Sequence, residues 1–478
     1  MIYKYPTEIE PLIGIKEQLQ LFAYGKSPLP SSDFFVRVQK GLSKRERLFT
    51  LLNGELNFHG ENSGYASHDL HAFAAKFPPQ LPRVFIRGLT MPGDVVLDPM
   101  MGSGTTVLEA LLEGRQGVGL DIDPLALRLS RAKTKPLDID NLRSAGNKVI
   151  SKANVLLTNG KTFERNFVNQ WDERTKAFVD YWFLPTTQRE LMALVLAIQK
   201  TSDATTRRFL ELTFSSIIVT KSGGVSLARD LAHSRPHLDK TKNPKNALEQ
   251  FSLRLRKNLL SISKLKTNGT LATPVAGDAR AMPFADGVID LIVTSPPYAN
   301  AIDYMRAHKF SLVWLGESIT DLSELRTHYV GSERVGKPRY ATLPAKAEMI
   351  IRKLAELDDS KAAILRKYFI EMRSVLAEMY RVLRNDSAAI VVVGTSVMRG
   401  INVETHNCLA EIATKVGFDV VGVVKRILDR NKRMMPARFG KKTDSMIEQR
   451  MHEEFVIGLL KPVQHQGEAL ANARTNYC

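Results

Sequence analysis

The stretch DVVLDPMMGSGTTVLEALLEGRQGVGLDID, residues 94–123, decides the fold of this chain. It contains a short apolar strand that ends at Asp98, a glycine-rich turn from Gly102 to Thr105, and a helical pattern over residues 107–113. A second apolar strand, residues 117–123, follows. This strand, helix, strand order predicts two parallel strands joined by a right-handed crossover.

The same alternation returns only after residue 272. Five more apolar runs there are expected to be strands: 275–279, 289–294, 388–395, 420–425 and 455–461. The predicted fold class is therefore α/β, a Rossmann-like sheet with helices on both faces.

The segment between the second and third predicted strands has a different pattern. Residues 136–272 carry helical spacing at 187–200, 207–220 and 246–265, which predicts a mainly helical insertion. Three divisions remain: an N-terminal extension (1–60), a discontinuous catalytic core (61–135 and 273–465) and a C-terminal tail (466–478). Helices are expected in the extension over 9–24 and 40–52. The core holds a smaller insertion (316–345), which an amphipathic pattern (348–383) follows.

Composition excludes several classes of protein. The chain has 478 residues, 44% of them hydrophobic, and no apolar stretch approaches the roughly 18 residues of a membrane span. Its start lacks the basic and then apolar run of a signal peptide, so a cytoplasmic protein without a membrane partner is expected. Two cysteines, Cys408 and Cys478, are too few for a disulfide framework or a metal cluster, and no metal site is predicted.

The formal charge of +17 is concentrated in two places. Residues 136–272 hold 22 Lys and Arg against 12 Asp and Glu, and residues 425–442 hold 8 against 1, so these two segments carry the whole excess. Clustered cations favour a polyanionic partner, because neutralising phosphates releases counterions. A solvated basic surface is the alternative for either segment.

The glycine-rich turn indicates a nucleotide-like ligand at the carboxyl edge of the sheet. Gly102 and Gly104 allow a ligand to approach the backbone closely. No Gly-Lys-Ser/Thr follows and the third glycine of the dinucleotide fingerprint is missing, which disfavours phosphate and favours a small zwitterion with an adenosine. Asp98 can orient the turn or accept from an amino group, and Asp121 can bind ribose hydroxyls, although Asp123 is an alternative for that role.

A second motif, Ser295-Pro296-Pro297-Tyr298, closes the apolar run 289–294. An exocyclic amino nitrogen is a poor nucleophile because its lone pair is delocalised into the ring. The Ser295 hydroxyl and the Pro296 carbonyl can accept hydrogen bonds from the two N–H groups of this nitrogen, and the two prolines fix the loop in place. Tyr298 offers a ring on which a base can stack after it has left the duplex.

Residues 98–106 resemble the first motif of the S-adenosylmethionine-dependent amino-methyltransferases of DNA, with Met100 where an aromatic residue is usual. The resemblance implies a class I methyltransferase sheet with S-adenosylmethionine as its cofactor. It also places Asp278 near the adenine amino group, and it implies that the segment 71–81 closes over the methionine moiety. The cofactor-binding residues expected on these grounds are Phe77, Asp98, Pro99, Gly102, Ser103, Gly104, Thr105, Asp121 and Asp278.

In that family a serine at the first position of the catalytic motif is associated mainly with cytosine N4, and aspartate or asparagine mainly with adenine N6. Ser295 therefore favours cytosine N4 in duplex DNA, with direct in-line transfer to a flipped base. Methylation of cytosine C5 is disfavoured because it needs a thiolate, and neither cysteine lies in a Pro-Cys turn. The alternatives are an adenine-N6 enzyme, a tRNA methyltransferase of the same fold, and a non-catalytic nucleic-acid-binding subunit.

Two regions are candidates for contact with DNA. The helical insertion lies between the two motifs, as the recognition region does in one class of the family, but here it precedes the Asp278 motif that recognition usually follows. Its segments 221–226 and 229–237 can track phosphates or base edges, or be solvated loops. The second candidate follows the predicted strand 420–425 and resembles a basic segment of cytosine-N4 enzymes, with Lys425, Arg426, Arg430, Lys432 and Arg433 facing DNA. The resemblance further implies a cognate restriction endonuclease or other defence-system subunits as partners.

Overall fold

The computed structural model describes residues 41–73, 76–158, 171–220, 224–229, 231, 236–267, 269–299, 303–332, 341–394, 396–428 and 453–463. The helix expected over 9–24 lies outside these residues.

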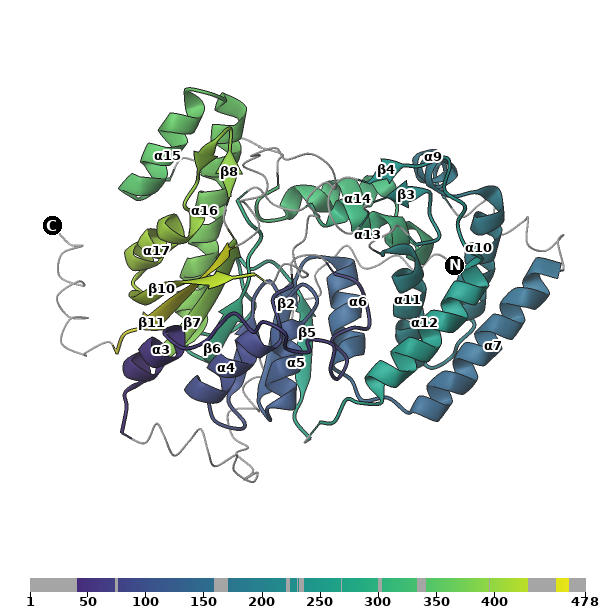
Figure 1. The fold of residues 1–478 in the computed structure, drawn as a ribbon, viewed down its shortest axis with the longest axis horizontal. Helices are drawn as coiled ribbons and strands as arrows, with labels where there is room; N and C mark the ends of the chain where they lie inside the picture. Colours follow the sequence, from purple (N-terminus) through teal and green to yellow (C-terminus); the bar gives the residue numbers. More distant parts are fainter. Residues whose placement is uncertain are drawn as a thin grey trace.

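A seven-stranded sheet forms the centre of the molecule (Figure 1). Its order is β10-β11-β7-β6-β1-β2-β5. Neighbouring strands from β7 to β5 pair in parallel, whereas β11 is antiparallel to both β7 and β10. The predicted α/β class is confirmed. The strands are β1 (Val95–Asp98), β2 (Gln116–Asp121), β5 (Ala272–Ala276), β6 (Ile289–Thr294), β7 (Leu383–Gly394), β10 (Asp419–Ile427) and β11 (Glu453–Lys461).

Helices cover both faces of the sheet because its central strands are apolar on both sides. In β7, Ile390 and Val392 join one apolar cluster while Val391 and Val393 join another, as the two-residue period of a strand requires. One face carries α3 (Lys44–Leu52), α4 (Gln80–Leu89) and α5 (Thr105–Leu112), and the other carries α15 (Ala345–Ala355), α16 (Asp359–Val382) and α17 (Thr405–Val416).

Helix α3 belongs to the core of the molecule, although the sequence assigns it to an N-terminal extension. Leu48 and Leu52 are buried against the sheet, and a Cβ on Gly458 of β11 would lie 2.5 Å from a methyl group of Leu52. The predicted amphipathic pattern over 348–383 is two helices, α15 and α16, because Asp358 caps a new helix by accepting from the Lys361 amide.

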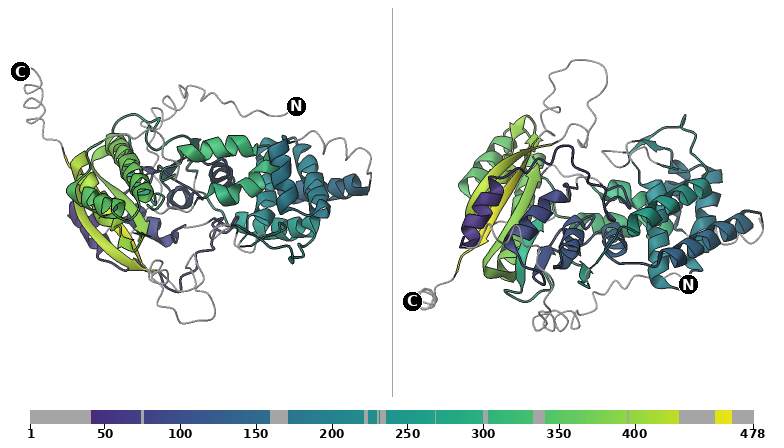
Figure 2. Two further views of the ribbon diagram at one scale, coloured as in Figure 1. Left: turned by 90° about the horizontal axis from the view of Figure 1, so that it is seen from above. Right: turned by 60° about the horizontal axis from the view of Figure 1, so that its bottom comes forward.

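The helices of the insertion lie beyond the β5 edge of the sheet and extend the molecule in that direction (Figures 1 and 2). In sequence these helices follow α6 (Pro124–Lys133), which packs against β5. They are α7 (Ile139–Thr158), α9 (Glu173–Trp182), α10 (Pro185–Gln199), α11 (Ala204–Ile218) and α12 (Ala247–Ile262), with the short strands β3 (Ala228–Arg229) and β4 (His237–Leu238) before α12.

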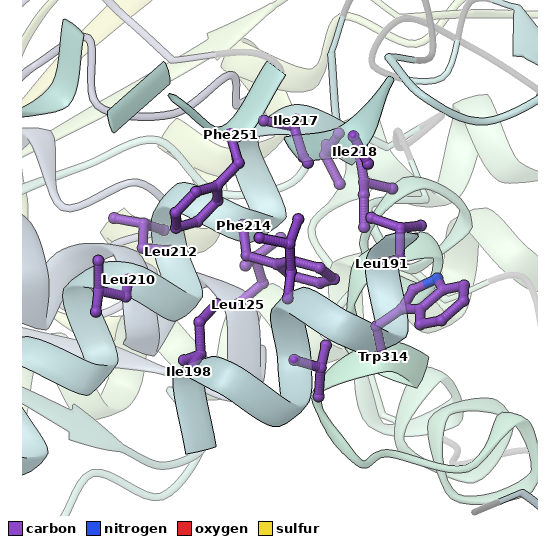
Figure 3. Packing of buried hydrophobic residues seen from close by; sticks show 14 of the residues in the cluster. Leu125, Leu191, Ile198, Leu210, Leu212, Phe214, Ile217, Ile218, Phe251 and Trp314 are labelled. Carbon is purple, nitrogen blue, oxygen red and sulfur yellow. The ribbon is translucent and has the colours of Figure 1, made fainter. Parts of the chain in front are cut away.

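The insertion shares one apolar core with its neighbours. Figure 3 shows Leu125 of α6 and Trp314 packed among side chains of α10, α11 and α12, and all of them belong to one buried cluster. Trp314 lies in η2 (Val313–Leu315), between α13 (Met305–Leu312) and α14 (Ile319–Leu325), which follow the catalytic motif in sequence. The insertion is therefore packed directly against elements that flank both motifs. Among the described helices, none is long and apolar enough to cross a membrane.

Candidate functional site

One pocket opens at the carboxyl ends of β1, β2, β5 and β6, where the two sequence motifs meet. Ten of the thirteen residues predicted to form the cofactor and catalytic site line it: Phe77, Asp98, Pro99, Gly102, Ser103, Thr105, Asp121, Asp278, Ser295 and Pro297. Gly104, Pro296 and Tyr298 do not line it.

The glycine turn needs both glycines, but for different reasons. Gly102 has φ +47° and a Cβ there would lie 3.0 Å from the ring of Phe73, so a side chain at this point of the pocket wall would strain the backbone and displace the ring. Gly104 has φ +71° and a Cβ there would lie 2.3 Å from Ser130 Oγ on α6. Gly104 does not line the pocket, and its missing side chain allows the start of α5 to pack closely against α6.

Asp121 faces the pocket at the end of β2. Its carboxylate accepts from the backbone amides of Gly102 and Asp123, each at 2.8 Å, so it fixes the turn from the opposite strand. Burial, with the nearby charge of Asp123, raises the pKa of Asp121 to about 7.

Asp123 is used for other purposes. One of its oxygens caps α6 by accepting from Leu125 and Ala126, and the other accepts from His308 Nδ1 at 2.7 Å and from the Tyr329 hydroxyl at 2.9 Å. Both aspartates line the pocket, but Asp121 accepts from backbone amides whereas Asp123 is also held by two side chains, which favours Asp121 for the ribose.

Asp98 connects the cofactor strand to the catalytic strand. It is buried, and one oxygen accepts from Thr294 Oγ1 at 2.7 Å, immediately before Ser295. Burial raises the pKa of Asp98 to about 6. A second bond reaches the same catalytic strand from the helix that follows the turn, because Thr106 Oγ1 of α5 donates to the Val293 carbonyl of β6 at 3.0 Å.

Asp278 lies at the rim of the pocket beyond β5. Both of its oxygens accept from the Arg280 guanidinium, at 2.6 to 3.0 Å, and Arg280 also donates to Glu371 at 2.8 Å. The carboxylate is thereby held in one orientation.

Two aromatic residues of the pocket wall were missed by sequence reasoning. Phe73 stacks on Tyr304 with ring centroids 5.3 Å apart, and both line the pocket. Phe73 lies in the segment 71–81 that the resemblance singled out, so a signal for it existed. Tyr304 lies just before α13, and nothing in the sequence links it to Phe73.

Tyr298 of the catalytic motif is held by β11, a strand that comes much later in the sequence. Its hydroxyl donates to Glu454 Oε1 of β11 at 3.0 Å. Glu454 in turn accepts from Arg426 Nη1 at 2.5 Å. Arg426 is only 2% exposed, so the prediction that it faces DNA is wrong: the strand buries its side chain. Lys425 beside it is exposed and pairs with Glu453 at 2.9 Å. Arg430, Lys432 and Arg433 lie outside the described residues.

A separate hollow, the basic hollow, lies in the insertion between α11, α12 and the segment before α12. Four cationic side chains line it, and among its described lining residues there is no carboxylate. Lys245 and Lys257 are exposed, and Lys257 Nζ is 3.8 Å from Asp69. Partial burial lowers the pKa of Lys242 to about 8. The four cations are Lys242, Lys245, Arg254 and Lys257.

Cys408 has no part in the pocket. It is buried in α17, and burial raises the pKa of its thiol to about 12, so it is protonated at neutral pH. In the described part of the chain, no group of three His, Cys, Asp or Glu side chains is arranged to hold a metal ion.

The residues of the main pocket fit S-adenosylmethionine. The Asp98 and Asp121 carboxylates can accept from the amino and hydroxyl groups of that ligand and balance its positive charge. Phe73 and Phe77 supply an apolar wall, and the bare backbone at Gly102 leaves room for the ligand.

Comparisons with known proteins agree with this assignment. Residues 37–132 match the family model described as DNA methylase. The type II methyltransferase M.MvaI of Kocuria varians is 24% identical over 393 residues, which cover 76% of this chain and 84% of that protein. M.BsoBI of Geobacillus stearothermophilus is 26% identical over 297 residues, 57% of each protein.

A solved S-adenosylmethionine-dependent methyltransferase from Methanosarcina mazei aligns over 80% of this chain and 98% of its own, at 11% identity and a TM-score of 0.29. The fold is established by the strand order itself.

The strand order, the glycine turn and the facing carboxylates define a Rossmann-like methyltransferase whose methyl donor is S-adenosylmethionine. Within that class, the similarities support an amino-methyltransferase of DNA, because residues 37–132 match the DNA methylase model and the similar proteins are type II methyltransferases.

Proposed function

We propose that this protein methylates the exocyclic N4 amino group of cytosine in duplex DNA. The observation that carries the proposal is that Ser295 and Pro297 line the same pocket as Asp98, Gly102 and Asp121. The group that would hold a base amino nitrogen and the groups that would hold the methyl donor therefore share one space.

The residues of the catalytic loop prepare the amino nitrogen. S-adenosylmethionine, when bound, supplies an activated methyl group. Ser295 Oγ accepts a hydrogen bond from one N–H of the base, and the carbonyl of Pro296, which stands between the pocket-lining residues Ser295 and Pro297, accepts from the other. These two bonds draw the nitrogen lone pair out of the ring. Thr294 is tied to Asp98, so the loop starts from a fixed point and needs little reorganisation during the reaction.

The choice of cytosine depends on Ser295. The hydroxyl is a neutral acceptor, and the family association described above favours cytosine N4 for a serine at this position. The substrate base must leave the helix to reach a pocket at the edge of the sheet, which requires base flipping.

The test is methyl transfer from S-adenosyl-L-[methyl-³H]methionine to duplex DNA, followed by digestion to nucleosides. We expect the label in N4-methylcytosine. Label found only in N6-methyladenine would reverse the base assignment, and label in tRNA but not in duplex DNA would move the substrate to RNA.

We also propose that the insertion contacts the DNA backbone through the basic hollow. Its cations are gathered on one surface, and counterion release rewards such clusters when they meet phosphates. The insertion is packed on α6 and α13, so a phosphate held there has a fixed position relative to the main pocket.

A cognate restriction endonuclease is the partner that this activity implies, because such pairs protect host DNA by methylation. The names of the similar proteins, type II methyltransferases, support this proposal. Expression of the gene in a host exposed to the candidate nuclease, with plasmid survival as readout, tests it.

A further inference from the structure

The hydroxyl of Tyr298 is held by a buried charged pair. It donates to Glu454 Oε1 at 3.0 Å, and Glu454 Oε2 accepts from Arg426 Nη1 at 2.5 Å. Glu454 is 8% exposed and Arg426 is 2% exposed. Neither charge has ready access to water in place of its partner, so the three side chains constrain one another.

Arg426 is itself fixed by the N-terminal segment. Its Nε donates to the Leu56 carbonyl at 3.0 Å and its Nη2 to the Asn57 carbonyl at 3.4 Å. Next to it, the amide of Ile427 donates to Asn57 Oδ1 at 2.6 Å. The guanidinium therefore presents Nη1 to Glu454 from a fixed position.

The ring of Tyr298 is restrained a second time by Gly394, the last residue of β7. A Cβ on Gly394 would lie 2.8 Å from Cε2 of the ring and 2.9 Å from Cζ. Bare backbone at this point lets the ring lie close to the strand, and the hydroxyl bond prevents it from swinging away.

We propose that Glu454 and Arg426 are positioning residues that hold Tyr298 in one orientation to receive the flipped base. The inference rests on the proposed function. Stability alone does not explain the arrangement, because well-packed apolar side chains often stabilise a protein as well as a buried ion pair does. A charged pair whose third partner is the tyrosine of the catalytic motif instead fixes a particular geometry.

A double-mutant cycle on kcat/KM for DNA tests the proposal. Tyr298→Phe removes the hydroxyl and keeps the ring, while Glu454→Gln keeps the shape and removes the charge. We expect each single change to lower kcat/KM on the order of tenfold, as loss of a charge-assisted hydrogen bond does. In the Tyr298→Phe background, Glu454→Gln should cost less than about twofold, because its partner is already lost.

Losses that multiply in the double variant, or single variants with wild-type kcat/KM, overturn the positioning role. Affinity for S-adenosylmethionine should stay unchanged in all three variants, which a general disturbance of the fold would not allow. Glu348→Gln is the control, since Glu348 of α15 also pairs with an arginine, Arg366 of α16 at 2.6 Å, and this pair is separate from the one that holds Tyr298.

Gly394→Ala provides a test that leaves the ion pair intact. The added methyl group pushes the ring of Tyr298, so kcat/KM for DNA should fall at least about threefold. An unchanged rate in Gly394→Ala would count against the proposal. A wild-type protein that transfers no methyl to DNA would overturn the proposed function itself, whereas an active wild type with independent losses would overturn only the positioning role.

Discussion

The two halves of the pocket are held together over very different distances along the chain. The cofactor half is local: Asp121 accepts from the amide of Gly102, 19 residues earlier, within one strand, helix, strand unit. The catalytic loop is not local, because Tyr298 depends on Glu454, 156 residues later, and on the N-terminal segment through Arg426. The turn and the two acids of the cofactor half thus come from one short motif, which Phe77 and Asp278 join from other parts of the chain, while the catalytic half requires the finished sheet.

The largest effect is expected in the catalytic half, when the hydroxyl of Ser295 is removed. Ser295→Ala should lower kcat by roughly a hundredfold or more, because one of two acceptors for the amino group is lost. Binding of S-adenosylmethionine, measured by calorimetry, should not change, since the cofactor half remains intact. If Ser295→Ala left methylation unchanged, the catalytic assignment would be wrong.

A substitution in the glycine turn should instead impair only the cofactor half. Gly102→Ala adds a Cβ at φ +47°, 3.0 Å from Phe73, and we expect affinity for S-adenosylmethionine to fall on the order of tenfold. Gly93→Ala is the matched control: Gly93 also has positive φ, +89°, but nothing lies within 4 Å of its added Cβ. Equal losses of affinity in the two variants would mean that backbone strain, and not the pocket, is responsible.

The pH dependence of cofactor binding should follow Asp121. Its carboxylate must be ionised to accept from the ligand, and its pKa is about 7, so affinity should tighten roughly tenfold as the pH rises from 5.5 to 8. In Asp121→Asn the remaining dependence should centre near pH 6, the value for Asp98. The same profile in both proteins would contradict this assignment.

The same two groups affect stability with the opposite sign. Folding raises both pKa values above 3.8, so the folded state binds protons more tightly than the unfolded chain. Their contribution to the free energy of unfolding therefore falls as the pH rises from about 4 to about 7. Urea unfolding of the ligand-free protein across this range measures it.

The smallest effect is expected outside both halves, in the basic hollow. Lys245→Gln combined with Lys257→Gln should weaken DNA binding by roughly threefold to tenfold, whatever the DNA sequence. The slope of log affinity against log salt concentration should become shallower by about two. Binding of S-adenosylmethionine should not change. Lys353→Gln is the control. Lys353 is an exposed lysine of α15, which lies on the β10 side of the sheet, whereas the insertion lies beyond β5 (Figure 1). An unchanged salt slope in the double variant would exclude phosphate contacts at the hollow.

Part of the predicted cofactor half shares one pocket in the structure. Asp98, Gly102 and Asp121 lie within the first strand, turn and strand, and all three line the pocket. Such units assemble from neighbours in the chain, so their pattern is visible in a single window. Arg426 shows what a local pattern does not reveal, since an arginine can be required by a buried partner.

The sequence by itself determined the α/β class, the seven strands and the two motifs, because strand periodicity and turn glycines are local properties of a chain. Tertiary structure alone decided that Asp123 is held by His308 and Tyr329, that Phe73 meets Tyr304, and that Arg426 supports Tyr298 through Glu454. These are contacts between residues far apart in sequence, and only the packing of the complete sheet with its helices brings them together.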